Sequence, residues 1–315
     1  MGKIKQIRPL RIALIADTFP PMRTSGAVQL RDLSREFINL GHRITVILPS
    51  SEIVENWIIE KSEDLTILRL KTPKTKGLNY FCRTINEFWM PFMMKKNYKK
   101  SPLVKQSIDY LVWYSPSIFH GPFVSYLKKL KTCKSYLIIR DIFPEWALDM
   151  RLINKGLPYL FFKLIAQFQY KVADSIGVQS PGNIKYFSKS KYGKKVVVLQ
   201  NWLGEPGKSE SSIQVDETKL AGRKICIYAG NMGVAQGMKI IIDLAKKVNK
   251  DTNLGFIFVG RGSQADQLKK LSVEYGLTNI LFYDEIDPDE IPNLYKQCHI
   301  GLVSLDLRHK SHNVP

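Results

Sequence analysis

Short apolar runs alternate along this chain with longer stretches in which apolar residues return at helical spacing. Within residues 1–200, the runs that have the length and composition of strands lie at 11–16, 44–48, 65–70, 110–114, 136–139, 175–178 and 196–199. Helical stretches lie between them at 25–40, 77–100 and 157–173. Because strands that alternate with helices pair in parallel, the pattern predicts an α/β domain.

The same rhythm resumes after a polar stretch rich in Gly, Pro and Ser at 204–219, which we interpret as a linker. Further strands are expected beyond it, at 225–229, 254–259, 279–283 and 299–305. Gly230, Gly233 and Gly237 separate the first of these strands from a helical stretch. Free amides at the start of a helix that follows a strand bind anions, although glycines here could equally serve only to make tight turns.

The charge of the chain is distributed unevenly. The 315 residues carry a formal net charge of +19. Residues 1–200 hold 33 Lys and Arg against 14 Asp and Glu, whereas residues 201–315 hold 14 of each. The first part should therefore face something anionic, such as membrane lipid, a phosphorylated acceptor or nucleic acid. No signature of DNA or RNA binding accompanies the charge, so nucleic acid is not expected as a partner.

The stretch 77–100 combines an aromatic stripe with a basic cluster. The stripe comprises Phe81, Ile85, Phe88 and Phe92, and the cluster comprises Lys95, Lys96, Lys99 and Lys100. This combination describes an interfacial helix on an anionic membrane. A core helix with a solvated basic end would give the same pattern, and Pro91 is expected to interrupt the helix in either case.

Other features indicate the compartment. The four cysteines lack metal or redox spacing, which favours reduced thiols in a cytosolic protein. The first apolar run stops at Asp17 and is too short for a signal peptide. No run approaches the ~20 apolar residues of a spanning helix.

Candidate chemistry lies where predicted strands end. Arg140 and Asp141 directly follow the strand at 136–139, at the edge where α/β folds place ligands. Glu145 is a further candidate for ligand binding at this edge, but next to Pro144 it also suits the first turn of a helix. His120 follows the strand at 110–114, and a lone histidine is more often structural. The first strand is not followed by GxGxxG, which argues against a dinucleotide site.

Three segments resemble the second domain of glycosyltransferases with the GT-B fold: YAGNMGVAQGMKIII, FVGRG and LFYDEIDPDEIPNLYKQCHIGLVSL. They are most similar to the family 4 retaining enzymes of bacterial surface-polysaccharide assembly, in particular the group of O-antigen L-fucosamine transferases. The string RDIFPEW at 140–146 resembles a signature of that group. The resemblance implies an α/β GT-B fold, with two Rossmann-like domains whose parallel sheets face a cleft.

The resemblance also implies residue roles. Asp141 is carried over as the catalytic residue, near the transferred sugar or the acceptor hydroxyl. The residues implied on the acceptor and sugar side are Ser25, Gly26, His120, Arg140 and Glu145. The residues implied to bind the nucleotide sugar are Gly230, Asn231, Gly233, Gln236, Gly237, Arg261, Asp284, Glu285 and Ile286.

The chain departs from the family pattern in three ways. Asn231 and Gln236 stand where family 4 enzymes commonly carry the Arg and Lys that grip the diphosphate, so backbone amides at 230–233 and Arg261 are expected to replace them. No Asp-x-Asp metal motif is evident in a suitable loop, so neither a metal nor another cofactor is expected. The sequence ends at HKSHNVP, which resembles the loop before a helix with paired glutamates. We therefore expect a C-terminally truncated, incomplete second domain.

These observations predict a retaining glycosyltransferase that is cytoplasmic and peripheral to the inner membrane. It would move a sugar from a nucleotide-diphosphate donor, expected to be UDP-linked, to a lipid-linked sugar diphosphate in O-antigen or capsule biosynthesis. Residues 1–200 would bind the acceptor and the anionic membrane surface, and residues 201–315 the nucleotide sugar. Two alternatives stay open: a GT-B sugar-nucleotide epimerase, or an inactive truncated remnant that acts at most as a membrane-associated binding partner.

Overall fold

The computed structural model describes residues 8–62, 64–188, 190–205, 209–251 and 253–306. The chain divides into two compact units, the first ending at Gly204 and the second beginning at Glu205. This division lies close to the boundary at residue 200 that the sequence predicts. The terminal string HKSHNVP lies outside the described residues.

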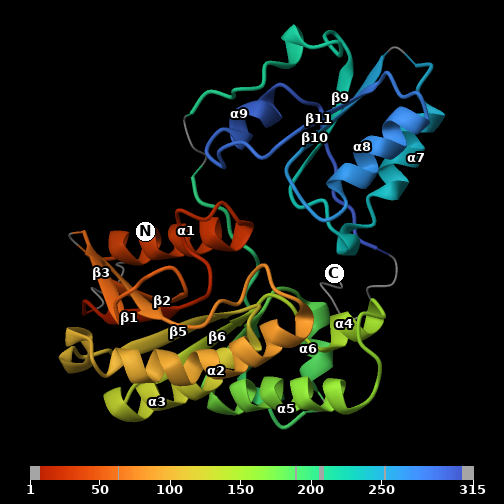
Figure 1. Ribbon diagram of the computed structural model, residues 1–315. Coiled ribbons are helices and arrows are strands. Elements are labelled where there is room, and N and C mark those ends of the chain that lie inside the picture. The colour runs from red at the N-terminus through yellow and green to blue at the C-terminus, as the bar shows by residue number, and fades with distance from the viewer. Residues whose placement is uncertain (1–7, 63, 189, 206–208, 252, 307–315) are drawn as a thin grey trace. The chain divides into compact units, whose positions relative to one another are not determined.

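The first unit is built on one eight-stranded sheet in the order β3-β4-β2-β1-β5-β6-β7-β8 (Figure 1). Its strands are β1 (Arg11–Ile15), β2 (Arg43–Ser50), β3 (Trp57–Lys61), β4 (Leu65–Lys71), β5 (Tyr110–Ser115), β6 (Lys134–Ile139), β7 (Ser175–Val178) and β8 (Val196–Val198). All neighbours pair in parallel except the edge strand β3, which runs antiparallel to β4. The sequence predicted every strand of this sheet apart from β3.

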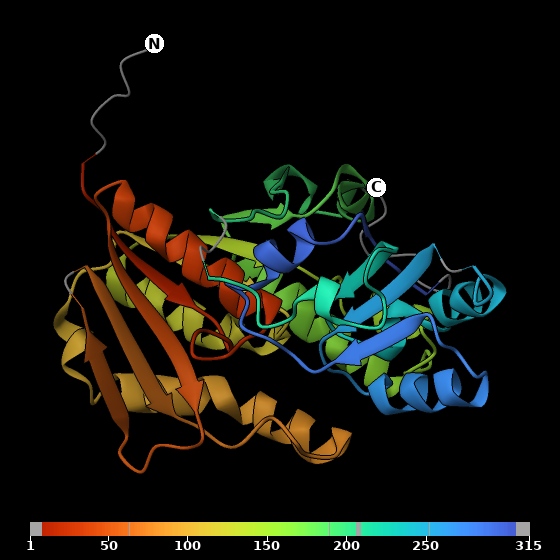
Figure 2. The same ribbon diagram turned by 90° about the horizontal axis from the view of Figure 1, so that it is seen from above.

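Helices cover both faces of this sheet. The helices on one face are α2 (Tyr80–Tyr98), α3 (Gly121–Lys131), α5 (Leu157–Val172) and α6 (Pro181–Ser188). Their cores meet around the fully buried Trp113 of β5. On the other face α1 (Ser25–Asn39) packs through Leu30. Figure 2, seen from above, shows this helix in red lying over the strands. The indole of Trp202 fixes α1 further by donating to the backbone oxygen of Gln29 over 2.9 Å.

The predicted interruption at Pro91 is wrong, because α2 continues through this residue to Tyr98. Pro91 removes one backbone hydrogen bond, which costs a free helix about 3 kcal/mol. In this helix Met90, Met94 and Tyr98 are all buried against the sheet. Burial of three large apolar side chains offsets that cost.

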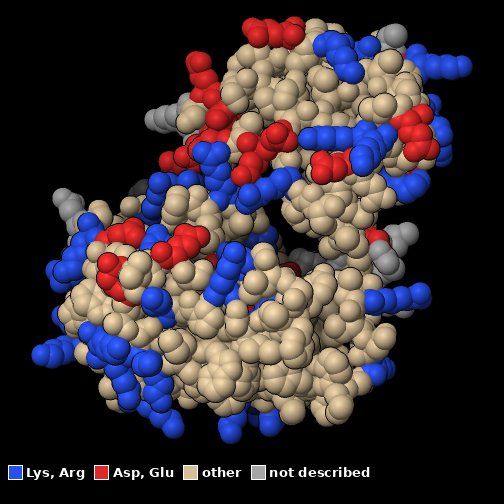
Figure 3. Space-filling view, in the orientation of Figure 1, with Lys and Arg blue, Asp and Glu red and all other residues tan. Residues whose placement is uncertain are grey.

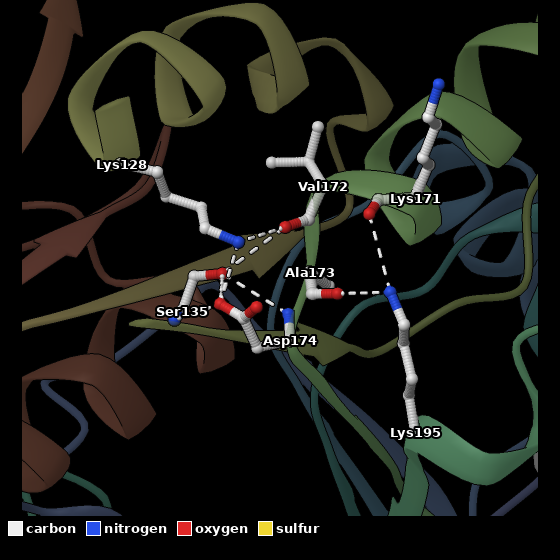
Figure 4. A network of polar contacts seen from close by, with 7 residues as sticks. All are labelled: Lys128, Ser135, Lys171, Val172, Ala173, Asp174 and Lys195. Atoms are coloured by element: carbon white, nitrogen blue, oxygen red, sulfur yellow. Dashed lines mark hydrogen bonds and ion pairs between the residues drawn. The ribbon is translucent and has the colours of Figure 1, made fainter. Parts of the chain in front are cut away.

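A polar network holds the amino ends of β6 and β7 in register (Figure 4). The carboxylate of Asp174 accepts from the backbone nitrogen and the hydroxyl of Ser135, both over 2.8 Å, and pairs with Lys128 over 2.7 Å. Lys195 donates to the backbone oxygen of Ala173 over 2.7 Å. Burial acts to raise the pKa of Asp174, but Lys128 and Ser135 outweigh it and the pKa is lowered. This network sets the strand alignment that places residues at the opposite, carboxyl edge.

The second unit has a four-stranded parallel sheet in the order β11-β10-β9-β12. Its strands are β9 (Lys224–Ala229), β10 (Leu254–Val259), β11 (Ile280–Tyr283) and β12 (Ile300–Gly301). Helices α7 (Lys239–Lys247) and α8 (Ala265–Glu274) cover one face, and α9 (Ile291–Lys296) packs on the other. The strand predicted at 299–305 is too long, because only Ile300 and Gly301 pair with β9 and Val303 is 92% exposed.

No helix in the described part of the chain has both the length and the apolar character needed to cross a bilayer.

Candidate active site

The guanidinium of Arg140 organises the carboxyl edge of the first sheet. It donates to the hydroxyl of Ser25 over 2.9 Å, to the phenol of Tyr114 over 2.8 Å and to the side-chain oxygen of Gln29 over 3.2 Å. The network therefore joins the ends of β5 and β6 to the first turns of α1. Burial raises the pKa of Tyr114, although Arg140 acts in the opposite direction. The phenol thus stays protonated at neutral pH.

Sequence reasoning predicted Ser25 and Arg140 for this site but missed Tyr114 and Gln29. Both carried a usable signal. Tyr114 stands at the carboxyl end of a parallel strand, and Gln29 lies one helical turn after Ser25, on the same face of α1.

Gly26 allows the close approach of α1 to this network. A Cβ at this position would lie 3.2 Å from the Tyr114 hydroxyl and 3.2 Å from the Thr18 methyl group. Both distances are tighter than ordinary van der Waals contact, so a larger residue would push α1 away from the sheet. The side chain of Thr24 caps the same helix by accepting from the backbone nitrogen of Ala27 over 3.2 Å. The predicted pair of Ser25 and Gly26 therefore lies at the site, with Gly26 as a packing residue.

The half-buried carboxylate of Asp17 lies close to both Tyr114 and the buried imidazole of His120. His120 is fully buried in a 3₁₀ turn (η2, Ile118–His120), and neither ring nitrogen has a hydrogen-bond partner among the described residues. Burial lowers the pKa of His120, while Asp17 at the end of β1 acts to raise it. One carboxylate oxygen of Asp17 is also buried without a described partner. The sequence predicted His120 but not Asp17, although a carboxylate directly after the first parallel strand is a usable signal.

Asp141 follows β6 and lines a cavity of about 760 Å³ within the first unit. Its backbone oxygen accepts from the nitrogen of Phe143 over 3.0 Å, which shapes the turn into α4 (Glu145–Asp149). The cavity is formed largely by apolar side chains of α2, η2, α4 and α5. A carboxylate in such a position can accept a hydrogen bond from a bound hydroxyl group.

Glu145 has a clear structural role. It is the first residue of α4, as its predicted place in a first helical turn requires. Its carboxylate accepts from the hydroxyls of Tyr186 and Tyr159 over 2.6 and 3.3 Å, and Lys163 lies 3.8 Å away. Glu145 thus ties α4 to α5 and α6. Its part in sugar binding stays a prediction.

In the second unit, the loop after β9 satisfies most of its own backbone donors. The nitrogen of Gly230 donates to the backbone oxygen of Val259 over 2.9 Å, and that of Met232 to Arg261 over 2.8 Å. The nitrogen of Gly233 donates to the side-chain oxygen of Gln236 over 3.1 Å. The expectation of free amides in this loop is therefore wrong at these three residues, because a second backbone strand and a glutamine accept from them.

The side chains of Asn231 and Gln236 are bonded to each other rather than exposed as two separate ligand-binding groups. The side-chain nitrogen of Asn231 donates to the same Gln236 oxygen over 3.2 Å, and the hydroxyl of Tyr228 donates to the backbone oxygen of Asn231 over 2.7 Å. Gln236 thus braces the loop from its 3₁₀ turn (η5, Val234–Gln236). Gly237 follows with a φ of +57°, a left-handed conformation that glycine adopts most easily.

The loops after β9 and β10 pack backbone against backbone. A Cβ at Gly260 would collide with the backbone oxygen of Gly230, and one at Gly262 would collide with the backbone of Met232. Arg261, between these glycines, pairs with the carboxylate of Glu285 over 2.9 Å and is 65% exposed. The structure thus brings the predicted glycines and Arg261 to one edge of the sheet.

The predicted residues after β11 reach the same edge. Asp284 pairs with Lys269 of α8 over 3.3 Å, and Ile286 packs against the apolar cluster under α9. Together with Glu285, they form a segment that approaches Arg261. Among the described residues, no three His, Cys, Asp or Glu side chains are grouped so as to hold a metal ion.

Comparison with known proteins gives a family match in the second unit. The family described as glycosyl transferases group 1 matches residues 210–307. The putative colanic acid biosynthesis glycosyl transferase WcaI of Escherichia coli K12 is 25% identical over 293 residues, which cover 82% of this chain and 68% of WcaI. The probable glycosyltransferase WbjE of Pseudomonas aeruginosa is 25% identical over 182 residues, which cover 55% of this chain and 44% of WbjE.

Solved structures share the fold. The catalytic domain of starch synthase IV from Arabidopsis thaliana, bound to ADP and acarbose, matches with a TM-score of 0.64 at 11% identity. The match covers 94% of this chain and 78% of that one. The predicted GT-B fold and transferase class are confirmed, and these findings together identify the chain as a glycosyltransferase with the GT-B fold.

Proposed function

We propose that this chain is a family 4 retaining glycosyltransferase of bacterial surface-polysaccharide assembly. It transfers a sugar from a nucleotide-diphosphate donor, UDP-linked by resemblance, to a lipid-linked acceptor. The match of residues 210–307 to the group 1 glycosyltransferases carries this proposal. The name of WcaI, a putative colanic acid biosynthesis enzyme, supports a role in polysaccharide assembly, and the ADP bound to starch synthase IV supports a nucleoside diphosphate as leaving group.

The second unit binds the donor in this proposal. The loop after β9, Arg261 and the segment after β11 lie at one sheet edge, where α/β folds bind ligands. Arg261 is the charged group suited to the diphosphate, because Asn231 and Gln236 are neutral. A phosphate oxygen that reached the nitrogen of Gly233 would have to displace the oxygen of Gln236, which now accepts from it.

The first unit binds the acceptor and orients its hydroxyl. Asp141 accepts a hydrogen bond from that hydroxyl, and the departing phosphate oxygen takes its proton. Donors and cations stabilise the charge that develops on the diphosphate, so the proposal requires neither a metal nor another cofactor. Arg140 positions Ser25 and Tyr114 rather than contacting substrate, because its guanidinium already donates to both of them.

We further propose that the protein is cytoplasmic and peripheral to the inner membrane. The side chains of Phe81 and Trp89 on α2 are 75% and 55% exposed. Lys95, Lys96, Lys99 and Lys100 gather at the end of the same helix, and all four are exposed. An apolar face beside such a basic cluster suits an anionic leaflet.

Transfer can be tested with the purified chain, UDP-sugars and lipid-linked sugar diphosphates presented in detergent. Product formation is followed by mass spectrometry of the lipid, and UDP binding by calorimetric titration. We expect saturable UDP binding and a product whose anomeric configuration matches the donor. Conversion of a UDP-sugar into its epimer without an acceptor would favour the epimerase alternative, and failure to bind any nucleoside diphosphate would contradict the proposal.

A further inference from the structure

The cavity that Asp141 lines is apolar along most of its wall. It lies between the first half of α2, η2, α4 and the start of α5, and its volume of about 760 Å³ is within the range of ligand sites. Seven aromatic side chains line the wall: Tyr80, Phe81, Phe119, Phe143, Trp146, Phe161 and Phe162. An apolar ligand in this cavity would replace water against these rings.

The inner end of the cavity meets the carboxyl edge of the sheet. Asp141 and Ser117, which follow β6 and β5, both line it. The segment before α2 lies at the same edge, because Lys76 donates to the backbone oxygen of Asp17 over 3.3 Å. The cavity therefore connects the site around Arg140 and Asp141 with the outer surface of α2 and α5.

The outer end opens among exposed apolar side chains. Tyr80 and Phe81 of α2 are 84% and 75% exposed, and Leu157 at the start of α5 is 83% exposed. The two helices adjoin, since the rings of Phe88 and Phe161 lie 6.2 Å apart. Figure 3 shows a broad uncharged surface over α2 and α5, with Lys and Arg around its lower rim. An apolar surface with a cationic rim is complementary to an anionic bilayer.

One cation lines the cavity. Arg83 pairs with Glu87 over 2.8 Å through its Nε, and its side chain is 52% exposed. Its two terminal nitrogens have no further partner among the described residues. Burial raises the pKa of Glu87, while Arg83 acts to lower it. The terminal nitrogens of Arg83 are thus available to a phosphate bound in the cavity.

We propose that this cavity holds the apolar chain of the lipid phosphate acceptor, an inference that rests on the proposed function. The chain enters from the bilayer under α2 and α5, its first segment packs against the aromatic wall, and its phosphate meets Arg83. The group beyond the phosphate then reaches Asp141. The cavity binds the apolar chain of the acceptor, whereas the outer faces of α2 and α5 bind the bilayer. Substitutions can therefore separate acceptor binding from membrane binding.

Farnesyl monophosphate is a suitable probe, because it carries a short isoprenoid chain and a phosphate without a membrane. Its binding is measured by calorimetry and by the fluorescence of Trp146, compared with inorganic phosphate and farnesol. Thr84 lines the cavity from α2, so Thr84→Phe fills it and should weaken binding at least about tenfold. Cys82→Phe places the same ring on an exposed residue of the same helix that does not line the cavity, and should leave the affinity unchanged.

Trp89→Ser completes the design, because Trp89 is exposed on α2 and does not line the cavity. It should weaken vesicle binding and leave farnesyl phosphate binding intact. The proposal is overturned if wild type and Thr84→Phe bind farnesyl phosphate with equal affinity. It is also overturned if inorganic phosphate binds as tightly as farnesyl phosphate, because the isoprenoid chain would then contribute nothing. Self-association that Trp89→Ser abolishes, with no farnesyl phosphate binding, would assign the face to a second copy of the chain. If the protein binds farnesyl phosphate but transfers no sugar, this inference is retained and the proposed function is contradicted instead.

Discussion

The guanidinium of Arg140 lies 2.9 Å from the hydroxyl of Ser25, although the two residues are 115 positions apart in the chain. The same guanidinium reaches Tyr114 and Gln29. One side chain thus joins the end of β6, the end of β5 and the start of α1. Parallel strands bring their carboxyl ends to one edge, and the arginine converts that adjacency into a fixed arrangement.

Replacement of Arg140 should disturb this arrangement directly. Arg140→Ala removes the donor that Ser25, Tyr114 and Gln29 share, at an expected cost of about 1–3 kcal/mol in the free energy of unfolding. Arg140→Lys should not restore the site, because an ammonium group cannot reproduce the planar fork. Urea denaturation and kcat/KM measure the two effects. Arg35→Ala, on an exposed part of α1, is the control, and an equally large effect there would remove the special role of Arg140.

Hydrophobic periodicity predicted most strands of both units and the long helices α1, α2 and α5, because buried strands and amphipathic helices leave strong local signals. β3 was missed because the half-exposed run Trp57–Ile59 passes directly into exposed Glu60 and Lys61. Contacts between segments that are distant in the sequence could not be predicted, because periodicity reports only on neighbouring residues. The bond from Met232 to Arg261 and the shared acceptor at Gln236 depend on how the loops after β9 and β10 meet. Asp17 was visible only as the end of an apolar run.

Asp141→Asn should leave the fold intact and lower transfer at least about 100-fold. The substitution keeps the size of the side chain but removes the charge that would attract the acceptor hydroxyl at the cavity. Transfer rates and thermal unfolding of the variant test this prediction. Near-normal turnover would make Asp141 a structural residue of the turn into α4.

Residues 77–105 should bind anionic membranes. Changing Lys95, Lys96, Lys99 and Lys100 to Glu replaces attraction by repulsion at the end of α2, and each lysine near an anionic leaflet contributes about 1 kcal/mol. Cosedimentation with anionic and with neutral vesicles should differ for the wild type and become equal for the variant. If the variant keeps its preference for anionic vesicles, the four lysines do not carry the interaction. Lys95 and Lys99 also lie 5.1 and 5.7 Å from the ring of Tyr126, so the unfolding midpoint of the variant needs to be measured alongside.

Asp174→Asn should destabilise the first unit in a pH-dependent way. The pKa of Asp174 is lowered in the folded state, so its contribution is fully present above the unfolded value of about 3.9 and is lost as the pH falls through the folded value. At pH 7 we expect a loss of about 1–3 kcal/mol, because Ser135 and Lys128 lose a charged partner. Denaturation curves at pH 7 and near pH 3 should show the difference between wild type and variant shrinking. A difference that stays constant with pH would assign the effect to packing.

Gln236→Lys should strengthen nucleoside diphosphate binding. The glutamine oxygen now accepts from the nitrogen of Gly233, so the substitution frees that amide and places a cation beside it. We expect the Kd for UDP to fall about tenfold, equivalent to roughly 1.4 kcal/mol, and to become more dependent on salt. Gln236→Ala separates the two causes, because it frees the amide without adding charge. If both variants bind UDP more weakly than the wild type, Gln236 contacts the nucleotide itself, and its bond to Gly233 is a resting arrangement that the ligand replaces.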